Sequence, residues 1–381
     1  ERLACVFLAE GEEEQERLTY AGLDARARAV ATALRRSCRP GDRALLLDPP
    51  GLDFIASFFG CLYAGVIAVP AYPPRSARML PRLEAILADA RPAVVLASNP
   101  ALQRVRAWLE RTPGAAAISW LASDGLDAAP AGWELPPPDA EAVAFLQYTS
   151  GSTSTPKGVM VSHGNLLHNE ERIRRAFGQS ESSVVVSWLP PYHDMGLIGG
   201  LLQPLYVGAL SILMSPVAFL QKPLRWLQAI SRYRGTTSGG PNFAYDLCVR
   251  RVPPAEIERL DLSSWQVAFN GAEPVRRATL DRFAAAFAPC GFRREAFVPC
   301  YGLAEATLIV TAGRLSEGSD GSDGSSAGPV SCGAPAGGEV LVVDPESGIS
   351  CDGETVGEIW VAGPSVAAGY WNRPDETCAA F

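Results

Sequence analysis

The sequence lacks the patterns on which zinc-binding and membrane-spanning proteins depend. It has only three histidines, and none of its nine cysteines belongs to a Cys-x-x-Cys pair, so no zinc site is indicated. Most cysteines, such as Cys61 and Cys248, lie in apolar surroundings, which predicts buried, reduced thiols in a cytoplasmic protein. The most membrane-like stretch, Phe54–Val69, has 16 residues, fewer than the roughly 20 that span a bilayer. We predict a buried helix followed by a buried strand there.

The sequence also lacks an excess of positive charge. It has 33 Lys and Arg residues against 41 Asp and Glu residues, a net charge of −8. Nucleic acids and anionic membranes attract basic surfaces, so we expect no nucleic acid partner and no stable membrane insertion. With 381 residues, 48% of them hydrophobic, the chain can bury a large core.

Strand and helix patterns alternate along most of the chain. Short continuous apolar runs predict strands at Ala44–Leu47, Ala93–Ala97, Val184–Trp188 and Leu210–Met214. Apolar residues at helical spacing predict helices at Leu23–Leu34, Leu80–Ala90, Asn165–Phe177 and Leu224–Tyr233. This alternation is typical of an α/β fold, in which mostly parallel sheets are stacked and flanked by helices.

Candidate site segments follow several of the apolar runs. Ligands of such sheets bind beyond the carboxyl ends of the strands, where these segments would lie. The segments are the loop near Lys157, the segment around His193, Ser238–Asn242, Asn270–Pro274 and Tyr301–Glu305. We therefore expect five separated segments to meet around one crevice.

The stretch Phe145–Asn165, FLQYTSGSTSTPKGVMVSHGN, contains a loop rich in Gly, Ser and Thr between two apolar runs. Backbone N–H groups, hydroxyls and the ammonium of Lys157 could bind a polyphosphate there. The Walker pattern does not fit, because Pro156 precedes the lysine and Gly158 follows it. Taken alone, such a loop is more often a solvated turn, and its lysine more often a solvated side chain.

Together with two further segments, SWLPPYHDMGLIGG (Ser187–Gly200) and CYGLAEATL (Cys300–Leu308), this loop closely resembles the adenylate-forming superfamily. That superfamily contains acyl-CoA synthetases, luciferases and peptide-synthetase adenylation domains. NGAEP (Asn270–Pro274) is similar to its adenine-contacting strand end. PPGLDFIASFFGCLYAGVIAVPAYPP, YHDMGLIGG, GTTSGGPNFAYDLC and YGLAEATL look specifically like fatty acyl-AMP ligases. The resemblance covers nearly the whole chain.

The resemblance implies that ATP and Mg²⁺ bind this chain. It implies catalytic roles for Lys157, His193 and Glu305, with Glu305 and Thr149 as magnesium ligands, which suits a metal that prefers hard oxygen atoms. Without it, Glu305 could be a glutamate at a helix N-terminus. The implied nucleotide-binding residues are Thr149, Ser150, Gly151, Ser152, Thr153, Lys157, Asn270, Gly271, Ala272, Glu273, Tyr301, Gly302, Leu303 and Ala304.

By the same resemblance, His193 lies beside the reacting carboxylate and α-phosphate, whereas His163 and His168 are expected to begin and line a helix. An apolar tunnel would hold the acyl chain, and each buried CH₂ group contributes about 0.8 kcal/mol. The alternative is that these apolar residues are ordinary core. The implied fatty-acid-binding residues are His193, Asp194, Met195, Gly196, Leu197, Ile198, Ser238, Gly239, Gly240, Pro241, Asn242 and Phe243.

The composition changes near residue 311. We expect an α/β part at about 1–311, a mobile Gly- and Ser-rich loop at about 313–329, and a β-rich subdomain at about 330–381. Strands are predicted at Glu339–Val343 and Glu358–Val361. Members of the superfamily continue into a small mobile C-terminal domain, so we interpret the chain as the large N-terminal domain without that swivelling domain.

The resemblance implies a fatty acyl-AMP ligase. Such an enzyme converts a medium- or long-chain fatty acid and ATP into acyl-AMP and pyrophosphate, and passes the acyl group to the phosphopantetheine of an acyl carrier protein or domain. A fatty acyl-CoA synthetase is the first alternative. A non-catalytic lipid or nucleotide sensor on the same fold is the second, although a sensor need not keep Lys157, His193 and Glu305.

Overall fold

The computed structural model describes residues 1–74, 76–109, 118–130, 132–135, 137, 139–149, 156–315, 330–353 and 355–381. They form a nine-stranded sheet, a six-stranded sheet and a separate two-stranded sheet. The larger sheet contains, in spatial order, β15 (Ala334–Pro335), β14 (Ile309–Ala312), β13 (Phe297–Gly302), β12 (Val267–Asn270), β11 (Thr237–Gly239), β9 (Val184–Ser187), β10 (Leu210–Met214), β1 (Leu3–Ala9) and β2 (Glu13–Thr19).

The six-stranded sheet contains β6 (Ser119–Ala122), β5 (Val94–Ala97), β3 (Arg43–Leu46), β4 (Ile67–Pro70), β7 (Val143–Thr149) and β8 (Lys157–Ser162), in spatial order. Most neighbouring strands in both sheets are parallel. The antiparallel pairs lie at the sheet edges: β1 with β2, β7 with β8, and β13, β14 and β15 in series. The predicted fold of mostly parallel sheets flanked by helices is confirmed.

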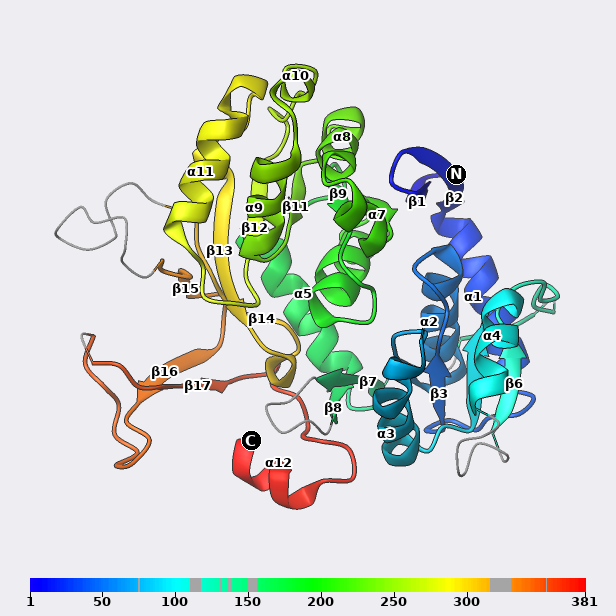
Figure 1. Cartoon of the computed structure of the whole chain (residues 1–381). Coiled ribbons are helices and arrows are strands. Elements are labelled where there is room, and N and C mark those ends of the chain that lie inside the picture. The colour runs from blue at the N-terminus through cyan, green and yellow to red at the C-terminus, as the bar shows by residue number, and fades with distance from the viewer. Residues whose placement is uncertain are drawn as a thin grey trace.

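Helices fill the space between the sheets and cover both outer faces. The central layer contains α1 (Tyr20–Leu34), α2 (Leu52–Ala64), α5 (His163–Phe177), the π-helix η3 (Met195–Leu202) and α6 (Gln203–Tyr206). The nine-stranded sheet is covered by α7 (Pro216–Gln221), α8 (Leu224–Tyr233), α9 (Asn242–Arg251) and α11 (Arg277–Phe287), and the six-stranded sheet by α3 (Leu80–Ala90) and α4 (Asn99–Leu109). Figure 1 shows α8, α9 and α11 along one side of the molecule.

Each sheet has two apolar faces because side chains alternate along a strand. On β3, Ala44 and Leu46 pack against the central helices, whereas Leu45 packs on the opposite face with α3 and α4. This double burial explains why the strands appear in the sequence as continuous apolar runs rather than as alternating patterns.

Several elements were predicted with little error. Leu80–Ala90, Leu210–Met214 and Leu224–Tyr233 have the predicted bounds, and Phe54–Val69 forms most of α2 and β4, joined at Gly65. His163 begins α5, as expected. No helix in the described part of the chain is long and apolar enough to cross a membrane. The β1–β2 pair and the π-helix were not predicted.

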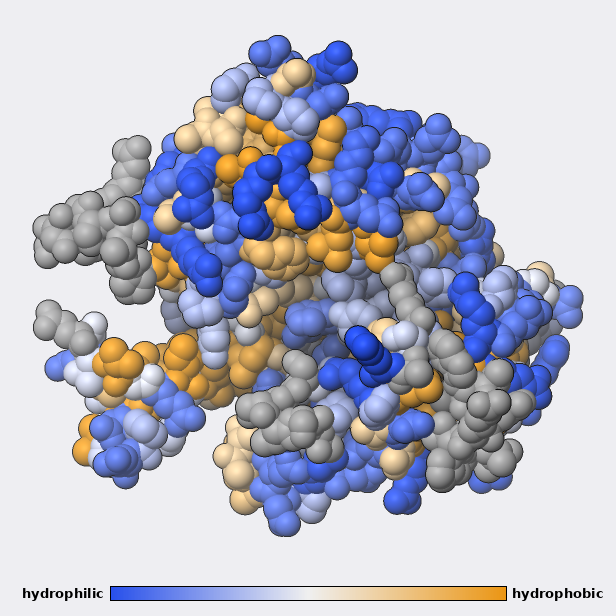
Figure 2. Space-filling model, in the orientation of Figure 1, coloured by the Kyte–Doolittle hydropathy of each residue, from blue (hydrophilic) through white to orange (hydrophobic). Residues whose placement is uncertain are grey.

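The C-terminal region contains the separate hairpin of β16 (Glu339–Val343) and β17 (Glu358–Ala362), followed by α12 (Pro374–Ala380). Both predicted strands are present, and Figure 1 shows them apart from the two large sheets. Figure 2 shows hydrophobic side chains gathered on this hairpin. The exposed ones are Leu341, Val342, Ile349, Val356, Ile359 and Trp360.

The mobile loop expected at about 313–329 lies mostly outside the described residues, which omit 316–329. At its beginning, Leu315 is buried, and its backbone N–H donates to the carbonyl of Phe297 at 3.0 Å. The division of the chain into an α/β part, a loop and a β-rich subdomain stays a prediction.

Candidate active site

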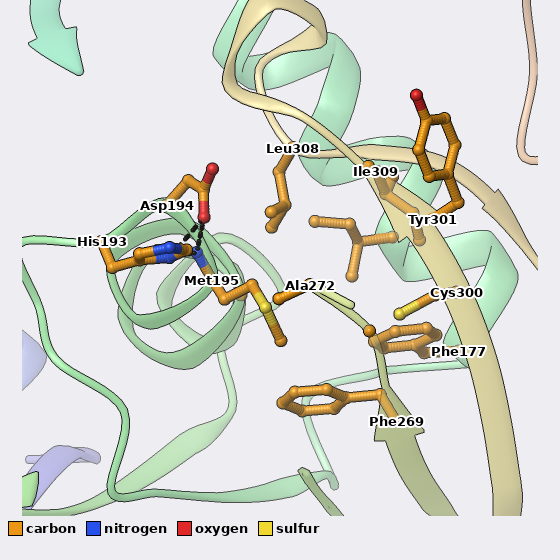
Figure 3. A pocket seen from close by; sticks show the side chains of 14 residues that line it. Phe177, His193, Asp194, Met195, Phe269, Ala272, Cys300, Tyr301, Leu308 and Ile309 are labelled. Atoms are coloured by element: carbon orange, nitrogen blue, oxygen red, sulfur yellow. Dashed lines mark hydrogen bonds and ion pairs between the residues drawn. The ribbon is translucent and has the colours of Figure 1, made fainter. Parts of the chain in front are cut away.

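The candidate site lies at the carboxyl ends of β13, β12 and β9 in the nine-stranded sheet, whereas the expected segment Ser238–Asn242, which follows β11 between them, lines neither of the site's two cavities. Asn270 is paired with Pro299 across β12 and β13, so the residues that follow these strands come side by side. Segments around His193, Gly271 and Tyr301 line one cavity, shown in Figure 3. Thr149, which ends β7 of the other sheet, lines a second cavity that meets the first at His193. The predicted phosphate-loop residues Ser150, Gly151, Ser152 and Thr153 lie outside the described residues.

The first cavity is apolar and has a volume of about 210 Å³. In Figure 3, His193 and Asp194 lie on one side and Tyr301 on the other, with the side chain of Met195 directed between them. The rings of Phe177 and Phe269 stack with centroids 5.9 Å apart. Its lining residues are Ile173, Phe177, His193, Asp194, Met195, Gly199, Phe269, Gly271, Ala272, Cys300, Tyr301, Gly302, Leu308 and Ile309.

The second cavity is more polar and larger, with a volume of about 580 Å³. It contains two guanidinium groups, Arg78 and Arg82, and the Thr149 end of β7. Its lining residues are Ala71, Tyr72, Arg78, Met79, Arg82, Leu83, Ile86, Gln147, Tyr148, Thr149, Tyr192, His193, Asp194 and Ala304. The sequence analysis missed both arginines, because arginines on a helix surface are usually solvated and no local pattern distinguishes these two.

His193 and Asp194 belong to both cavities and interact directly. His193 Nδ1 lies 2.6 Å from Asp194 Oδ1, and 51% of the His193 side chain is exposed. Desolvation lowers the pKa of His193, but the hydrogen bond and negative charge of Asp194 outweigh it, so the pKa is raised above its ordinary value. The carboxylate therefore favours the imidazolium form at the junction of the two cavities.

The turn before the π-helix fixes this pair. The side chain of Asp194 accepts a hydrogen bond of 2.6 Å from the N–H of Met195 and so caps the helix. A Cβ atom on Gly196 would overlap the carbonyl oxygen of Pro190, so only glycine allows the chain to fold back this closely. The wider π-helical turns follow at once, and such turns are often found at functional sites.

A tight loop from Gly302 to Leu308 presents Glu305. The N–H of Leu303 donates to the carbonyl of Leu308 at 3.0 Å, and a Cβ on Gly302 would overlap that same oxygen. Thr307 has φ 68° and ψ −63°, and Leu308 N–H donates to Ala306 O at 2.8 Å, which defines a γ-turn of the rare positive-φ kind. Such strain persists only where the surroundings enforce it, and it is frequent at functional sites.

Buried hydrogen bonds hold this strained loop. The hydroxyl of Thr307 donates to the carbonyl of Ser365 at 2.7 Å. The Asn169 side chain donates to the carbonyls of Ala306 and Ile309 at 3.2 and 3.1 Å and accepts from the Ile309 N–H at 3.0 Å. Because Asn169 and Thr307 are fully buried, these bonds fix the position of the loop relative to α5.

Glu305 and Lys157 have partners that the sequence analysis missed. The hydroxyl of Tyr370 donates to Glu305 Oε1 at 2.6 Å, and Lys157 Nζ lies 2.5 Å from Glu376 Oε2. Desolvation, then the hydrogen bond and charge of Glu305, raise the pKa of Tyr370. The hydrogen bond from Lys157 is the largest cause that lowers the pKa of Glu376. The partners lie far apart in the sequence, so no local pattern could have indicated them.

The donor chemistry around Glu305 fits magnesium but not a metal held by protein ligands alone. Within the described residues, no group of three or more His, Cys, Asp or Glu side chains could hold a metal. Magnesium typically uses one or two carboxylates and completes its shell with waters and substrate phosphates. The carboxylate of Glu305 and the hydroxyl of Thr149 are suitable oxygen donors for a metal that arrives with ATP.

Part of the predicted fatty-acid-binding set has other contacts. Ser238 accepts from Trp226 Nε1 at 2.7 Å and donates to the carbonyl of Val186 at 2.5 Å within the core. Asn242 Oδ1 accepts from Asn270 Nδ2 at 3.2 Å. The predicted site residues that line neither cavity are Lys157, Gly196, Leu197, Ile198, Ser238, Gly239, Gly240, Pro241, Asn242, Phe243, Asn270, Glu273, Leu303 and Glu305. Their roles stay predictions.

Known proteins are similar to this chain in sequence and in architecture. The family described as AMP-binding enzyme matches residues 1–371. A medium-chain-fatty-acid–[acyl-carrier-protein] ligase of Moorena producens is 47% identical, with 100% of this chain and 69% of the relative covered. A long-chain-fatty-acid–AMP ligase of Mycolicibacterium smegmatis is 38% identical, with 96% and 62% covered.

Solved structures agree with these relatives. A fatty acyl-adenylate ligase from L. pneumophila, in complex with acyl adenylate and pyrophosphate, matches with a TM-score of 0.91 and 46% identity. The match covers 100% of this chain and 69% of that one. The chain therefore spans about two thirds of the length of each of these proteins.

Proposed function

Because this chain belongs to the AMP-binding enzyme family and, within it, to the fatty acyl-AMP ligases, we propose that it activates a medium- or long-chain fatty acid with ATP. The products are acyl-AMP and pyrophosphate, and the acyl group then passes to the phosphopantetheine of an acyl carrier protein. The observation that carries the proposal is that an apolar and a polar cavity meet at His193 and Asp194. A fatty acid and a nucleotide need surroundings of these two kinds on either side of the reacting atoms.

The fatty acid tail occupies the apolar cavity in this proposal. Apart from His193 and Asp194, where it meets the polar cavity, its lining residues, including Phe177, Phe269 and Met195, are uncharged, so this part excludes water and favours long chains over acetate. Its carboxylate points to His193, whose imidazolium lessens the repulsion between two anions. The carboxylate of Asp194 favours the charged form of that ring and fixes its orientation.

The nucleotide extends from the Tyr301 end of the apolar cavity into the polar one. Adenine lies between the ring of Tyr301 and the backbone of Gly271 and Ala272, which line the cavity together. The phosphates extend towards Thr149 and Lys157. Magnesium, when bound, neutralises charge on the departing pyrophosphate, and Glu305 is the residue that would hold it.

We also propose a cytoplasmic location, because all nine cysteines are free and free thiols persist in reducing compartments. The carrier protein that accepts the acyl group would then also be cytoplasmic. This location can be tested by fractionating cells that produce the native protein.

Release of pyrophosphate tests the first step. The protein is incubated with ATP, Mg²⁺ and fatty acids of increasing length, and acyl-AMP is identified by mass spectrometry. We expect pyrophosphate and acyl-AMP to form together, and more rapidly with long chains than with acetate. If no fatty acid releases pyrophosphate although fatty acid and nucleotide both bind, the protein is a sensor and not a ligase.

The acyl acceptor needs a separate test. The acyl-AMP formed is offered either CoA or a phosphopantetheinylated carrier protein, and the thioester products are measured. We expect acyl-carrier protein and little acyl-CoA. Efficient formation of acyl-CoA would identify a fatty acyl-CoA synthetase and overturn the assignment of the acceptor.

A further inference from the structure

The segment 367–371 connects the strand of Lys157 with the loop of Glu305. Along β8, the N–H of Met160 donates to Gly369 O at 2.9 Å and the N–H of Trp371 donates to Gly158 O at 2.7 Å. At its other end, the N–H of Ala367 donates to the backbone carbonyl of Glu305 at 2.8 Å. The N–H of Ala368 also donates to Met160 O at 3.2 Å, so four backbone bonds hold one short segment against the strand of Lys157 and the loop of Glu305.

Tyr370 is the side chain in this segment that contacts both groups. Its hydroxyl donates to Glu305 Oε1 at 2.6 Å, and its ring centroid lies 4.9 Å from Lys157 Nζ. Only 7% of Tyr370 is exposed. A buried ring has few alternative rotamers, so both contacts are fixed in one geometry.

The surroundings of Tyr370 are fixed as well. Its N–H donates to Thr377 Oγ1 at 2.9 Å, and that hydroxyl donates to Arg373 O at 2.7 Å at the start of α12. Arg373 forms ion pairs with Glu376 at 3.0 Å and with Asp89 at 3.3 Å. The position of Tyr370 thus depends on α12 as well as on β8.

This arrangement solves an electrostatic problem. A lysine that binds phosphate and a carboxylate that binds magnesium would neutralise each other if they formed an ion pair. Among the described residues, Lys157 pairs with Glu376 and no cation is within ion-pair distance of Glu305. Tyr370 contacts both residues with different atoms. Its ring face lies against the ammonium of Lys157, and its hydroxyl donates to the carboxylate of Glu305.

We propose that Tyr370 is a positioning residue that orients Glu305 towards magnesium and keeps Lys157 from pairing with Glu305. The inference rests on the proposed function, because it assigns Tyr370 a part in binding the metal–nucleotide substrate. The hydroxyl occupies Oε1, so the other oxygen, Oε2, is the one that would hold the metal. Tyr370 itself touches neither substrate nor metal.

The variant Tyr370→Phe tests the hydroxyl alone, since the ring face for Lys157 remains. Binding of Mn²⁺ in the presence of a non-hydrolysable ATP analogue is followed by electron paramagnetic resonance, which needs no turnover. We expect Mn²⁺ to bind about tenfold more weakly, the effect of losing one hydrogen bond to a carboxylate. The matched control is Tyr63→Phe, which removes a 3.0 Å bond to Asp24 far from the site and should leave Mn²⁺ binding unchanged.

A double-mutant cycle with Glu305→Gln shows whether Tyr370 acts through Glu305. In that background, Tyr370→Phe should weaken Mn²⁺ binding no further, because the group it orients is gone. Unchanged or tighter Mn²⁺ binding by Tyr370→Phe, or equal losses in both backgrounds, would overturn the proposal. Thermal unfolding of each variant separates these results from loss of fold.

The two hypotheses can fail independently. If the wild-type protein releases no pyrophosphate but the cycle behaves as expected, the proposed reaction is wrong and the positioning role stands. If pyrophosphate is released and Tyr370→Phe binds Mn²⁺ normally, the reaction stands and the positioning role is wrong.

Discussion

The two cavities that meet at His193 and Asp194 differ in lining and in origin. The apolar one is built from the ends of β12 and β13 of the nine-stranded sheet together with α5 and the π-helix of the central layer. The polar one is lined mainly by residues near β4, α3 and β7, which belong to the six-stranded sheet and its helix. The nine-stranded sheet thus supplies most of the apolar surroundings and the six-stranded sheet most of the polar ones, and the two cavities meet at His193 and Asp194.

This difference predicts that each side can be damaged separately. A substitution on the polar side should impair nucleotide chemistry and leave fatty acid binding intact. A substitution in the part of the apolar cavity away from Gly271, Ala272 and Tyr301 should change the preference for chain length and leave ATP binding intact. The following variants test that separation.

The largest effect is expected for Glu305→Gln, which removes the charge of the candidate magnesium ligand. Pyrophosphate release should fall by about a thousandfold, the upper range for loss of one group that stabilises transition-state charge. Fatty acid binding, measured by fluorescence of a labelled analogue, should be unchanged. Normal turnover of the variant would contradict the metal role.

Gly199→Leu should have the next largest effect, and only on the apolar side. Gly199 lines the apolar cavity, and the nearest atom to a new Cβ is Leu308 Cδ2 at 3.6 Å, so Ala fits and Leu fills the space. Excluding about three CH₂ groups at about 0.8 kcal/mol each lowers kcat/KM for the longest fatty acids by about fiftyfold.

Its control is Gly199→Ala, which should differ little from the wild type. KM for ATP should stay the same in both variants. An equal loss for short and long chains would show that the apolar cavity does not hold the tail.

Asp194→Asn changes the junction of the cavities. The pKa of His193 is raised by Asp194, so the imidazolium persists to higher pH in the wild type. Without the carboxylate the pKa falls, and the decline of kcat/KM with rising pH should begin at lower pH, by about tenfold in rate for each pKa unit.

The pH profile of pyrophosphate release measures this shift. Asp24→Asn is a suitable control, because Asp24 pairs with Arg28 on α1 outside both cavities. If the pH profile of pyrophosphate release is identical for Asp194→Asn and the wild type, His193 takes no part in the reaction.

The smallest effect is expected for Glu376→Gln. Glu376 holds Lys157 in a partly exposed ion pair that the phosphates must displace. Removing this competition should lower KM for ATP by about twofold to fivefold, the range for exposed pairs, with kcat unchanged. A raised KM would show that Glu376 supports Lys157 instead of competing for it.

The sequence predicted those parts of the site that depend on local chemistry. Of the five segments expected to meet, those around His193, Gly271 and Tyr301 line one cavity, because parallel strands bring their carboxyl ends to one edge. Ser238–Asn242 lines neither cavity, and most of the loop before Lys157 lies outside the described residues. For the three segments that meet, the order of strands and glycine-containing turns along the chain was sufficient to predict that they lie together.

Other parts depend on tertiary contacts that no local pattern contains. Ser238 looks like a polar site residue, but whether its hydroxyl is already satisfied depends on Trp226 and Val186. Tyr370 looks like core filler, and its contact with Glu305 appears only when segments 65 residues apart meet. The π-helix at Met195–Leu202 likewise has the composition of an ordinary apolar helix.

The C-terminal helix carries a feature of practical use. Cys378 lies on α12, two residues after Glu376, and it is the exposed one among the nine free cysteines. Burial raises the pKa of others, to about 12 for Cys5 and Cys300, so those thiols resist alkylation at neutral pH. A thiol-reactive dye would therefore attach mainly at Cys378, and its emission would report in real time whether α12 shifts when nucleotide arrives.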